Sequence, residues 1–174
     1  WPTMQKNPAS SVACILQNRR PYAAAEIKGS NHFPDILGKA AFYTVQNGTL
    51  LTVFLTGLPT QPEHRVFGFH IHEGDRCAGN AEDPFADAKA HYNPQNPLHP
   101  YHAGDLPPVF SNDGWAWYAV ITTRFHSEEI IGKTMILHAM PDDLMTQPSG
   151  NSGEKIACGI IRKTDLGFTR SRIF

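Results

Sequence analysis

Short runs in which apolar and polar residues alternate recur along most of the chain. The clearest is Gly48–Thr56, where Leu51 and Val53 fall on one face of a strand and the threonine between them falls on the other. Alternation of this kind indicates a strand that is buried on one side. By pattern and composition we predict further strands at Ala23–Gly29, Leu37–Gln46, Val66–His72, Trp115–Thr123, Thr134–His138 and Lys155–Arg162.

Turn signals separate these runs. Asn47-Gly48 joins two predicted strands and is a strong signal for a two-residue hairpin, because both positions tolerate positive φ. An Asn-Asp-Gly turn at 112–114 precedes another strand, and the only helical suggestion is a short turn at Ser127–Ile131. Seven or more short strands separated by turns predict an all-β sandwich or barrel.

The composition fits one compact domain. With 174 residues and 41% hydrophobic content, the chain can bury a sizeable core. The formal net charge is −1 and no basic run is present, so no nucleic-acid partner is expected. No apolar stretch approaches the roughly 20 residues of a membrane span, so no membrane partner is expected either. The sequence leaves the oligomeric state open, a homodimer included.

Histidines gather around a long polar segment. Glu73 to Gly114 is rich in Pro, Gly and Asn and lacks periodicity, which predicts a long loop. Just before it, His70 and His72 stand two residues apart in a predicted strand, so both imidazoles point to one face while Ile71 points to the core. His138 ends another predicted strand and can reach the same ion. Together these three histidines form most of a metal site.

The loop offers a second set of ligands. His99, His102 and Asp105 supply two nitrogens and one carboxylate oxygen, which suits tetrahedral zinc once a further nitrogen is added. His91 has two ring nitrogens and can fill the vacancy in both sets. It would complete a four-nitrogen site suited to copper beside a site of three nitrogens and one oxygen suited to zinc. We therefore predict two metal ions that share one histidine.

Four ordered blocks of the sequence resemble the copper–zinc superoxide dismutases. They are Gly68–Glu73, His91–Pro94, His102–Leu106 and Gly150–Gly159. The resemblance spans about Ala23 to Arg162. A single His-x-His is a weak signal, but four ordered blocks that carry the ligands are specific. The resemblance implies a Greek-key β-barrel of about eight antiparallel strands, with a long metal-binding loop and a disulfide.

The resemblance also assigns roles to residues. It implies that copper is bound by His70, His72, His91 and His138. It implies that zinc is bound by His91, His99, His102 and Asp105. Asp142 is expected to link a copper-bound and a zinc-bound imidazole and so to orient both. Three histidines lie outside the pattern and are expected not to bind metal, namely His32, His64 and His126.

A disulfide between Cys77 and Cys158 is a further implication of the resemblance. Closing a loop of roughly 80 residues should stabilise the fold by about 4 kcal/mol and pin the metal loop to the barrel. Cys14 would then remain a free thiol. The family keeps this disulfide in cytosolic members, so it does not decide the compartment. We expect a cytoplasmic protein if the chain is complete as given, and a secreted or periplasmic one if a signal peptide has been removed.

The implied activity is dismutation of superoxide to oxygen and hydrogen peroxide, in which copper cycles between Cu(II) and Cu(I) and zinc has no redox role. His91 would deliver a proton to nascent peroxide as a general acid.

Lys155 stands where the family usually has arginine, beside copper. Lysine keeps the positive charge but lacks the planar guanidinium with its fixed set of donors. Because the loop Ala139–Glu154 has acidic residues and no basic one, we expect an active enzyme that is slower and less sensitive to ionic strength than its relatives.

The chain is predicted to consist of one domain with a segment on either side of it. Residues 1–21 are interpreted as an N-terminal extension, 22–162 as a superoxide dismutase-like domain and 163–174 as a C-terminal tail.

A non-catalytic metal-binding protein on the same barrel is disfavoured because all four copper positions are filled. A dizinc hydrolase ranks lower still, because its motif needs aspartate and histidine where this chain has Gly74 and Asp75.

Overall fold

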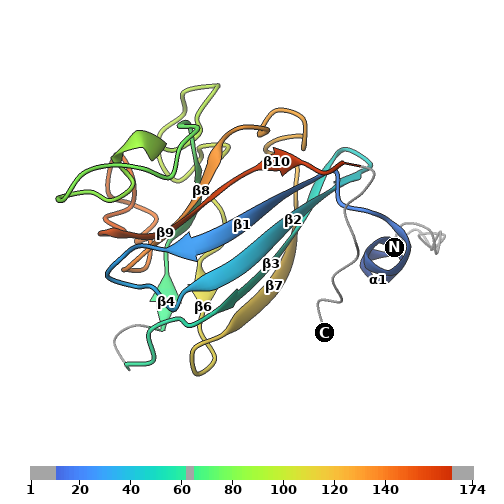
Figure 1. The fold of residues 1–174 in the computed structure, drawn as a ribbon. Helices are drawn as coiled ribbons and strands as arrows, with labels where there is room; N and C mark the ends of the chain where they lie inside the picture. The colour runs from blue at the N-terminus through green and yellow to red at the C-terminus, as the bar shows by residue number, and fades with distance from the viewer. Residues whose placement is uncertain (1–10, 62–64, 166–174) are drawn as a thin grey trace.

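The computed structural model describes residues 11–61 and 65–165. Its main element is an eight-stranded antiparallel sheet in the order β5-β8-β9-β1-β2-β3-β7, with β10 also paired to β1. A separate two-stranded sheet pairs β4 with β6. The strands are β1 (Ala23–Gly29), β2 (Leu37–Val45), β3 (Gly48–Thr56), β4 (Val66–Phe67), β5 (Phe69–His72), β6 (Val109–Phe110), β7 (Ala116–Thr122), β8 (Thr134–His138), β9 (Lys155–Ile160) and β10 (Arg162–Lys163). The predicted all-β class is confirmed, and Figure 1 shows how the sheet curls.

The hairpin predicted at Asn47-Gly48 joins β2 to β3. The two strands pair in register from Leu37 opposite Thr56 to Val45 opposite Gly48. Asn47 has a φ of 64°, the left-handed conformation that asparagine tolerates better than most residues. The alternating pattern of the sequence therefore specifies this pair of strands and the turn between them.

The predicted strand Val66–His72 is divided into two. β4 pairs with β6, and β5 pairs with β8, so the chain changes partner at Gly68. A Cβ atom at this position would lie 2.8 Å from the hydroxyl oxygen of Ser152, which explains the glycine. The two-residue strand β6 escaped the sequence analysis because it is too short to show a period.

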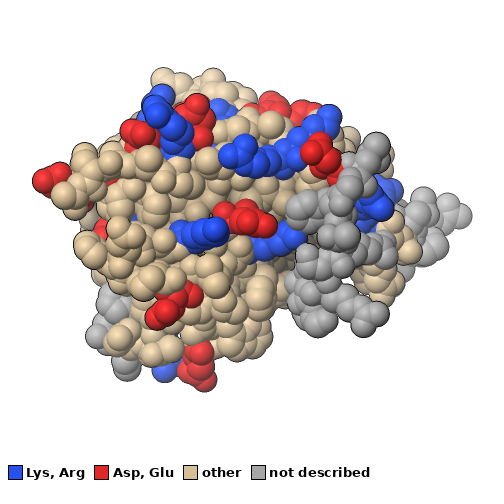
Figure 2. Space-filling model, viewed as in Figure 1, with Lys and Arg blue, Asp and Glu red and all other residues tan. Residues whose placement is uncertain are grey.

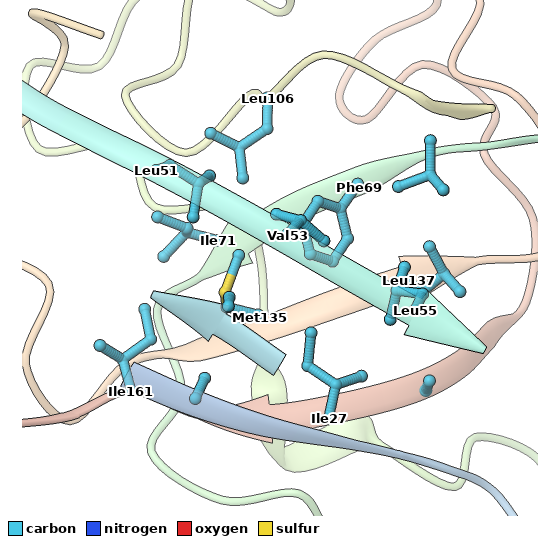
Figure 3. Packing of buried hydrophobic residues seen from close by; sticks show 14 of the residues in the cluster. Ile27, Leu51, Val53, Leu55, Phe69, Ile71, Leu106, Met135, Leu137 and Ile161 are labelled. Atoms are coloured by element: carbon cyan, nitrogen blue, oxygen red, sulfur yellow. The ribbon is translucent and has the colours of Figure 1, made fainter. Parts of the chain in front are cut away.

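The apolar core lies inside the curled sheet. Leu51 and Val53 of β3 pack with Phe69 and Ile71 of β5 and with Met135 of β8, as Figure 3 shows. All five are at most 1% exposed. Ile71 thus points to the core, as predicted, and leaves the opposite face of β5 to the two histidines that flank it. The core thereby fixes the strand on which the candidate metal ligands stand.

A short helix, α1 (Val12–Asn18), covers part of the outer face of the sheet. Its Ile15 is 3% exposed and packs with Ala41, Tyr43 and Leu50 of β2 and β3. The Ser11 side chain caps the helix by accepting a hydrogen bond from the Cys14 N–H. The segment lies in the predicted N-terminal extension, for which no helix was expected. Because α1 covers the outer face, both faces of β3 are largely buried.

Charged side chains lie on the outer face of β1 and β2 beside this helix. Figure 2 shows Lys and Arg side chains interspersed with Asp and Glu on the face that β1 and β2 turn to the viewer in Figure 1. Glu26 of β1 stands opposite Lys39 of β2 in the ladder. At the C-terminal end, Lys163 lies in β10 and the Thr164 N–H donates to the Tyr22 carbonyl. No helix within the described ranges is long and apolar enough to cross a membrane.

Candidate metal centre

A long loop connects β5 to β6. In residues 73–108, all of which the structure describes, the only helix or strand element is the 3₁₀ helix η2 (Ala86–Ala88). The disulfide between Cys77 and Cys158 ties the loop to β9, as predicted. Figure 1 shows the loop in green beside β8 and β9. Cys14 is a free thiol in α1.

Four histidines form the first group of candidate ligands. His70 and His72 lie on β5, and His138 is the last residue of the neighbouring β8, where a register shift between Leu137 and His138 interrupts the ladder. His91 comes from the loop, and its backbone pairs with that of His72 in an isolated antiparallel β-bridge. One ring nitrogen from each of the four lies within 4.8 Å of the others. The strand pairing that the apolar residues determine therefore brings the predicted copper ligands together.

The second group is centred on a carboxylate. The Asp105 Oδ1 lies 2.8 Å from the Nδ1 of His91 and 3.3 Å from the Nδ1 of His102. The Asp105 Oδ2 lies 3.1 Å from the Nδ1 of His99. All four residues are buried, and their candidate ligand atoms also lie within 4.8 Å of one another. The group consists of the predicted zinc ligands, and His91 belongs to both groups.

Asp142 connects the two groups a second time. Its Oδ2 accepts a hydrogen bond from the Nε2 of His70 at 2.7 Å, and its Oδ1 accepts one from the Nε2 of His99 at 2.9 Å. The side chain is 2% exposed. Burial opposes its charge, but hydrogen bonds from His70, the Leu144 N–H and His99 outweigh burial and hold the pKa of Asp142 well below its ordinary value. The predicted position of Asp142 between the two clusters is present in the structure.

Close packing protects that contact. Gly150 has a φ of +69°, and a Cβ atom there would lie 2.0 Å from the Asp142 Oδ1 and 2.7 Å from the His99 Nε2. Any side chain at this position would separate the carboxylate from the imidazole. Gly150 is thus required both by its backbone conformation and by the approach of the chain to Asp142.

Hydrogen bonds at one ring nitrogen leave the other nitrogen of each imidazole in the first group available. The Nδ1 of His72 donates to the Lys89 carbonyl at 2.8 Å, and the Nδ1 of His138 donates to the Gly153 carbonyl at 3.2 Å. Their Nε2 atoms face each other at 3.3 Å. The Nδ1 of His70 and the Nε2 of His91 are buried with no hydrogen-bond partner at all. Buried polar atoms without partners are costly, and a metal ion at this point would satisfy these nitrogens.

The buried environment favours neutral imidazoles, the form that binds metal. Burial lowers the pKa of His70 and His102 and lowers that of His72 further. Burial, together with repulsion from His70, lowers the pKa of His138 to about 3. Burial opposes the charge of Asp105, yet the hydrogen bond with His91 and the nearby imidazoles keep the pKa of this carboxyl below its ordinary value. A set of neutral nitrogens with one carboxylate suits copper and zinc.

A cavity of about 650 Å³ opens onto the first group, and its lining includes His72, His91 and His138. Lys155 also lines it and stands opposite His138 in the ladder of β8 and β9. The ammonium of Lys155 is not free, because it lies 2.5 Å from the Asp83 Oδ2. The Lys155 side chain therefore lies at the cavity, as expected, but it is paired with Asp83, a partner that was not predicted from the sequence.

Comparison with known proteins agrees with this geometry. The family model for copper/zinc superoxide dismutase matches residues 36–161. The chain belongs to the copper/zinc superoxide dismutase family. It is 32% identical over 144 residues to superoxide dismutase Cu-Zn 2 of Aquifex aeolicus, covering 74% of this chain and 80% of that protein. It is 36% identical over 140 residues to the Cu-Zn superoxide dismutase of Escherichia coli, covering 72% of this chain and 79% of the relative.

A solved structure leads to the same family. The Cu/Zn superoxide dismutase from Brucella abortus superposes with a TM-score of 0.68 at 25% sequence identity. The match covers 79% of this chain and 98% of that one. The fold similarity therefore extends over essentially the whole of the solved superoxide dismutase.

Some residues that hold the site were not found from the sequence. The Nη1 of Arg124 donates to the carbonyl oxygens of Pro100, His102 and Asp105 at 3.1, 3.2 and 3.1 Å. This arginine clamps the segment that carries the second ligand group, yet it lies outside the motifs and has no sequence signal. Among the histidines outside the pattern, His32 and His126 belong to neither group, and His64 lies outside the described residues.

Proposed function

We propose that this member of the family converts superoxide to oxygen and hydrogen peroxide at the two adjoining ligand groups, with copper at the first and zinc at the second. The observation that carries the assignment is His91, whose Nδ1 contacts the carboxylate of the second group while its Nε2 lies buried and unpaired in the first. No other residue belongs to both groups among the described residues. Named relatives with this activity support the reaction.

The protein residues determine which nitrogen each imidazole presents. Backbone carbonyls hold the Nδ1 of His72 and His138, so both rings present Nε2. Asp142 holds the Nε2 of His70, so this ring presents Nδ1. When bound, copper supplies one-electron redox chemistry and zinc supplies a fixed positive charge. The surrounding hydrogen bonds keep the donor set in place without reorganisation.

His91 is the residue suited to move a proton. Its Nδ1 is fixed beside Asp105, at 2.8 Å, so the ring stays in position whichever state its Nε2 is in. The Nε2 can take up a proton and release it to a reduced oxygen species in the cavity that His91 lines. The complete set of four imidazoles, including His138, speaks against a non-catalytic role, and no contact in the site favours hydrolysis.

The assignment is tested by metal content, spectroscopy and rate together. The oxidised protein should contain one copper and one zinc per chain, give a nitrogen-ligated tetragonal EPR signal, and remove superoxide in pulse radiolysis. His138→Ala should lose copper and reduce the rate constant by more than about 100-fold, since even the loss of partners outside the ligand set costs about 10–100-fold. His99→Ala should lose zinc while retaining copper.

The matched control is His126→Ala, which removes an exposed histidine from outside both groups. It should leave metal content, EPR signal and rate as in the unmodified protein. Copper that remains fully bound in His138→Ala, or a copper-loaded protein without dismutase activity, would refute the assignment.

A further inference from the structure

The cavity above the first ligand group carries charges of both signs. Lys89 and Lys155 line it together with three acidic residues, Glu82, Asp83 and Glu154. Superoxide is an anion, so its rate of entry depends on how these charges balance. With the histidines neutral, the acidic side chains outnumber the lysines. The attraction of an anion into the cavity therefore depends on whether each lysine is already paired with a carboxylate.

Lys155 is engaged in two contacts on the wall of this cavity. Its ammonium lies 2.5 Å from the Asp83 Oδ2 and donates to the Phe85 carbonyl at 3.3 Å. The side chain of Lys155 is only 16% exposed, and that of Asp83 is 37% exposed. The contacts hold the ammonium against the loop, so the ammonium has less capacity to attract a further anion.

The loop holds the Asp83 carboxylate ready for this contact. Its Oδ1 accepts a hydrogen bond from the Phe85 N–H at 3.0 Å, which leaves Oδ2 for Lys155. The Asp83 N–H in turn donates to the Asn80 Oδ1 at 2.9 Å. Burial opposes ionisation of Asp83, but hydrogen bonds from Lys155 and Phe85 outweigh burial and lower its pKa. These hydrogen bonds orient the carboxylate and favour its charged form.

We infer that Asp83 is a positioning residue that masks Lys155 and thereby limits how readily anions enter the cavity and reach the first ligand group. This inference rests on the proposed function for its meaning in catalysis. An entering anion has to compete with a carboxylate that is already bound to Lys155. Asp83 acts through Lys155 and does not itself touch the ligand group.

Glu82 provides a matched control. It precedes Asp83 in the chain and lines the same cavity, but it is exposed, and no hydrogen bond or ion pair joins it to Lys155 among the described contacts. Asp83→Asn and Glu82→Gln remove the same charge from the same cavity wall. Only the first releases the ammonium. A difference between these two variants therefore reports the ion pair and not the net charge.

The first readout does not depend on activity. In the metal-free protein, an amine-reactive reagent followed by peptide mass spectrometry should label Lys155 about 3- to 10-fold faster in Asp83→Asn than in Glu82→Gln, because an ammonium that is no longer held by a carboxylate is more accessible to the reagent. Asp83→Glu, which keeps the charge, should restore slow labelling. Equal labelling of Lys155 in Asp83→Asn and Glu82→Gln would overturn the inference.

The second readout is anion entry into the copper-loaded protein, with azide as the probe and superoxide as the substrate. Asp83→Asn should bind azide and consume superoxide about 3- to 10-fold faster at low ionic strength, at or below the lower limit for electrostatic steering by a whole charged cleft, and its rate should fall more steeply with salt. Glu82→Gln should change either rate by less than about 2-fold. In Lys155→Met, the further change Asp83→Asn should give no gain.

The outcomes separate this inference from the proposed function. Faster labelling of Lys155 with unchanged azide and superoxide rates in Asp83→Asn would overturn it, as would a gain that persists in the Lys155→Met background. Faster azide binding in Asp83→Asn, with no dismutation by any variant, would support the masking role while refuting the proposed activity.

Discussion

The hairpin of β2 and β3 and the loop 73–108 reach a fixed structure by different means. The hairpin pairs along its whole length, from Leu37 opposite Thr56 to Val45 opposite Gly48, and alternate side chains enter the core. The loop contains a single three-residue 3₁₀ helix. It is held by a disulfide, by the arginine Arg124 and by buried imidazoles. Many similar contacts order the first region, and a few dissimilar ones order the second.

The two regions allow effects on stability to be separated from effects on metal binding. Substitutions in the hairpin should act on the free energy of unfolding of the whole barrel, because its residues share one core. Substitutions at the points that hold the loop should act on metal affinity first. The disulfide is the exception, since it belongs to the loop and to β9 at once.

Removal of the disulfide should therefore have the largest effect and should affect both regions. In the double variant Cys77→Ser with Cys158→Ser, the free energy of unfolding should fall by about 4 kcal/mol, because the bond closes 81 residues of chain. Metal affinity should fall as well, since the loop is released from β9. Denaturant unfolding of the metal-free and metal-loaded forms measures the two effects. An unchanged metal affinity in the double variant would show that the disulfide does not hold the loop in its metal-binding position.

A core substitution should affect stability without favouring one metal. Leu51→Ala removes a side chain that is fully buried in the main cluster and should cost about 3 kcal/mol in unfolding of the metal-free protein. Leu98→Ala is the control in the loop, where the side chain is 71% exposed, and should change stability by less than about 0.5 kcal/mol. A large loss of stability in Leu98→Ala would show that the loop has an apolar core of its own.

Release of the arginine clamp should have the smallest effect and the most local one. Arg124→Ala removes hydrogen bonds to the carbonyls of Pro100, His102 and Asp105 and should weaken zinc binding about 10-fold, the equivalent of about 1.4 kcal/mol. Chelator competition measures the zinc affinity. Arg76→Ala is the control, since it removes an arginine from the loop 73–108 itself and its side chain is 72% exposed. If both variants bind zinc equally, Arg124 does not position the second group.

The two regions also differ in how far the sequence predicted them. The bounds predicted for β1, β3 and β8 agree with the structure, because alternation in a strand is local information. The helix α1 was missed because Ile15 is its only buried residue and a helix of seven residues shows little periodicity. The partner change at Gly68 was also missed, since β4 and β5 pair with two different strands, β6 and β8, that lie far along the chain.

The candidate ligands were predictable because spacing and family motifs encode them. The seven residues and Asp142 come together in the structure, while the assignment of the metals to them stays a proposal. The masking of Lys155 was not predictable, because Asp83 lies 72 residues away and carries no motif. Contacts between distant single residues are set by the fold, and a reading of local pattern cannot supply them.

The carboxylate of Asp142 is hydrogen-bonded to one imidazole from each ligand group, with 2.7 Å to His70 and 2.9 Å to His99. A cation that orders His70 would thereby also order the anchor of His99, and the reverse holds to the same extent. Such thermodynamic linkage is reciprocal by necessity. Filling of either ligand group should therefore raise the affinity of the other for its cation, by the same factor in both directions.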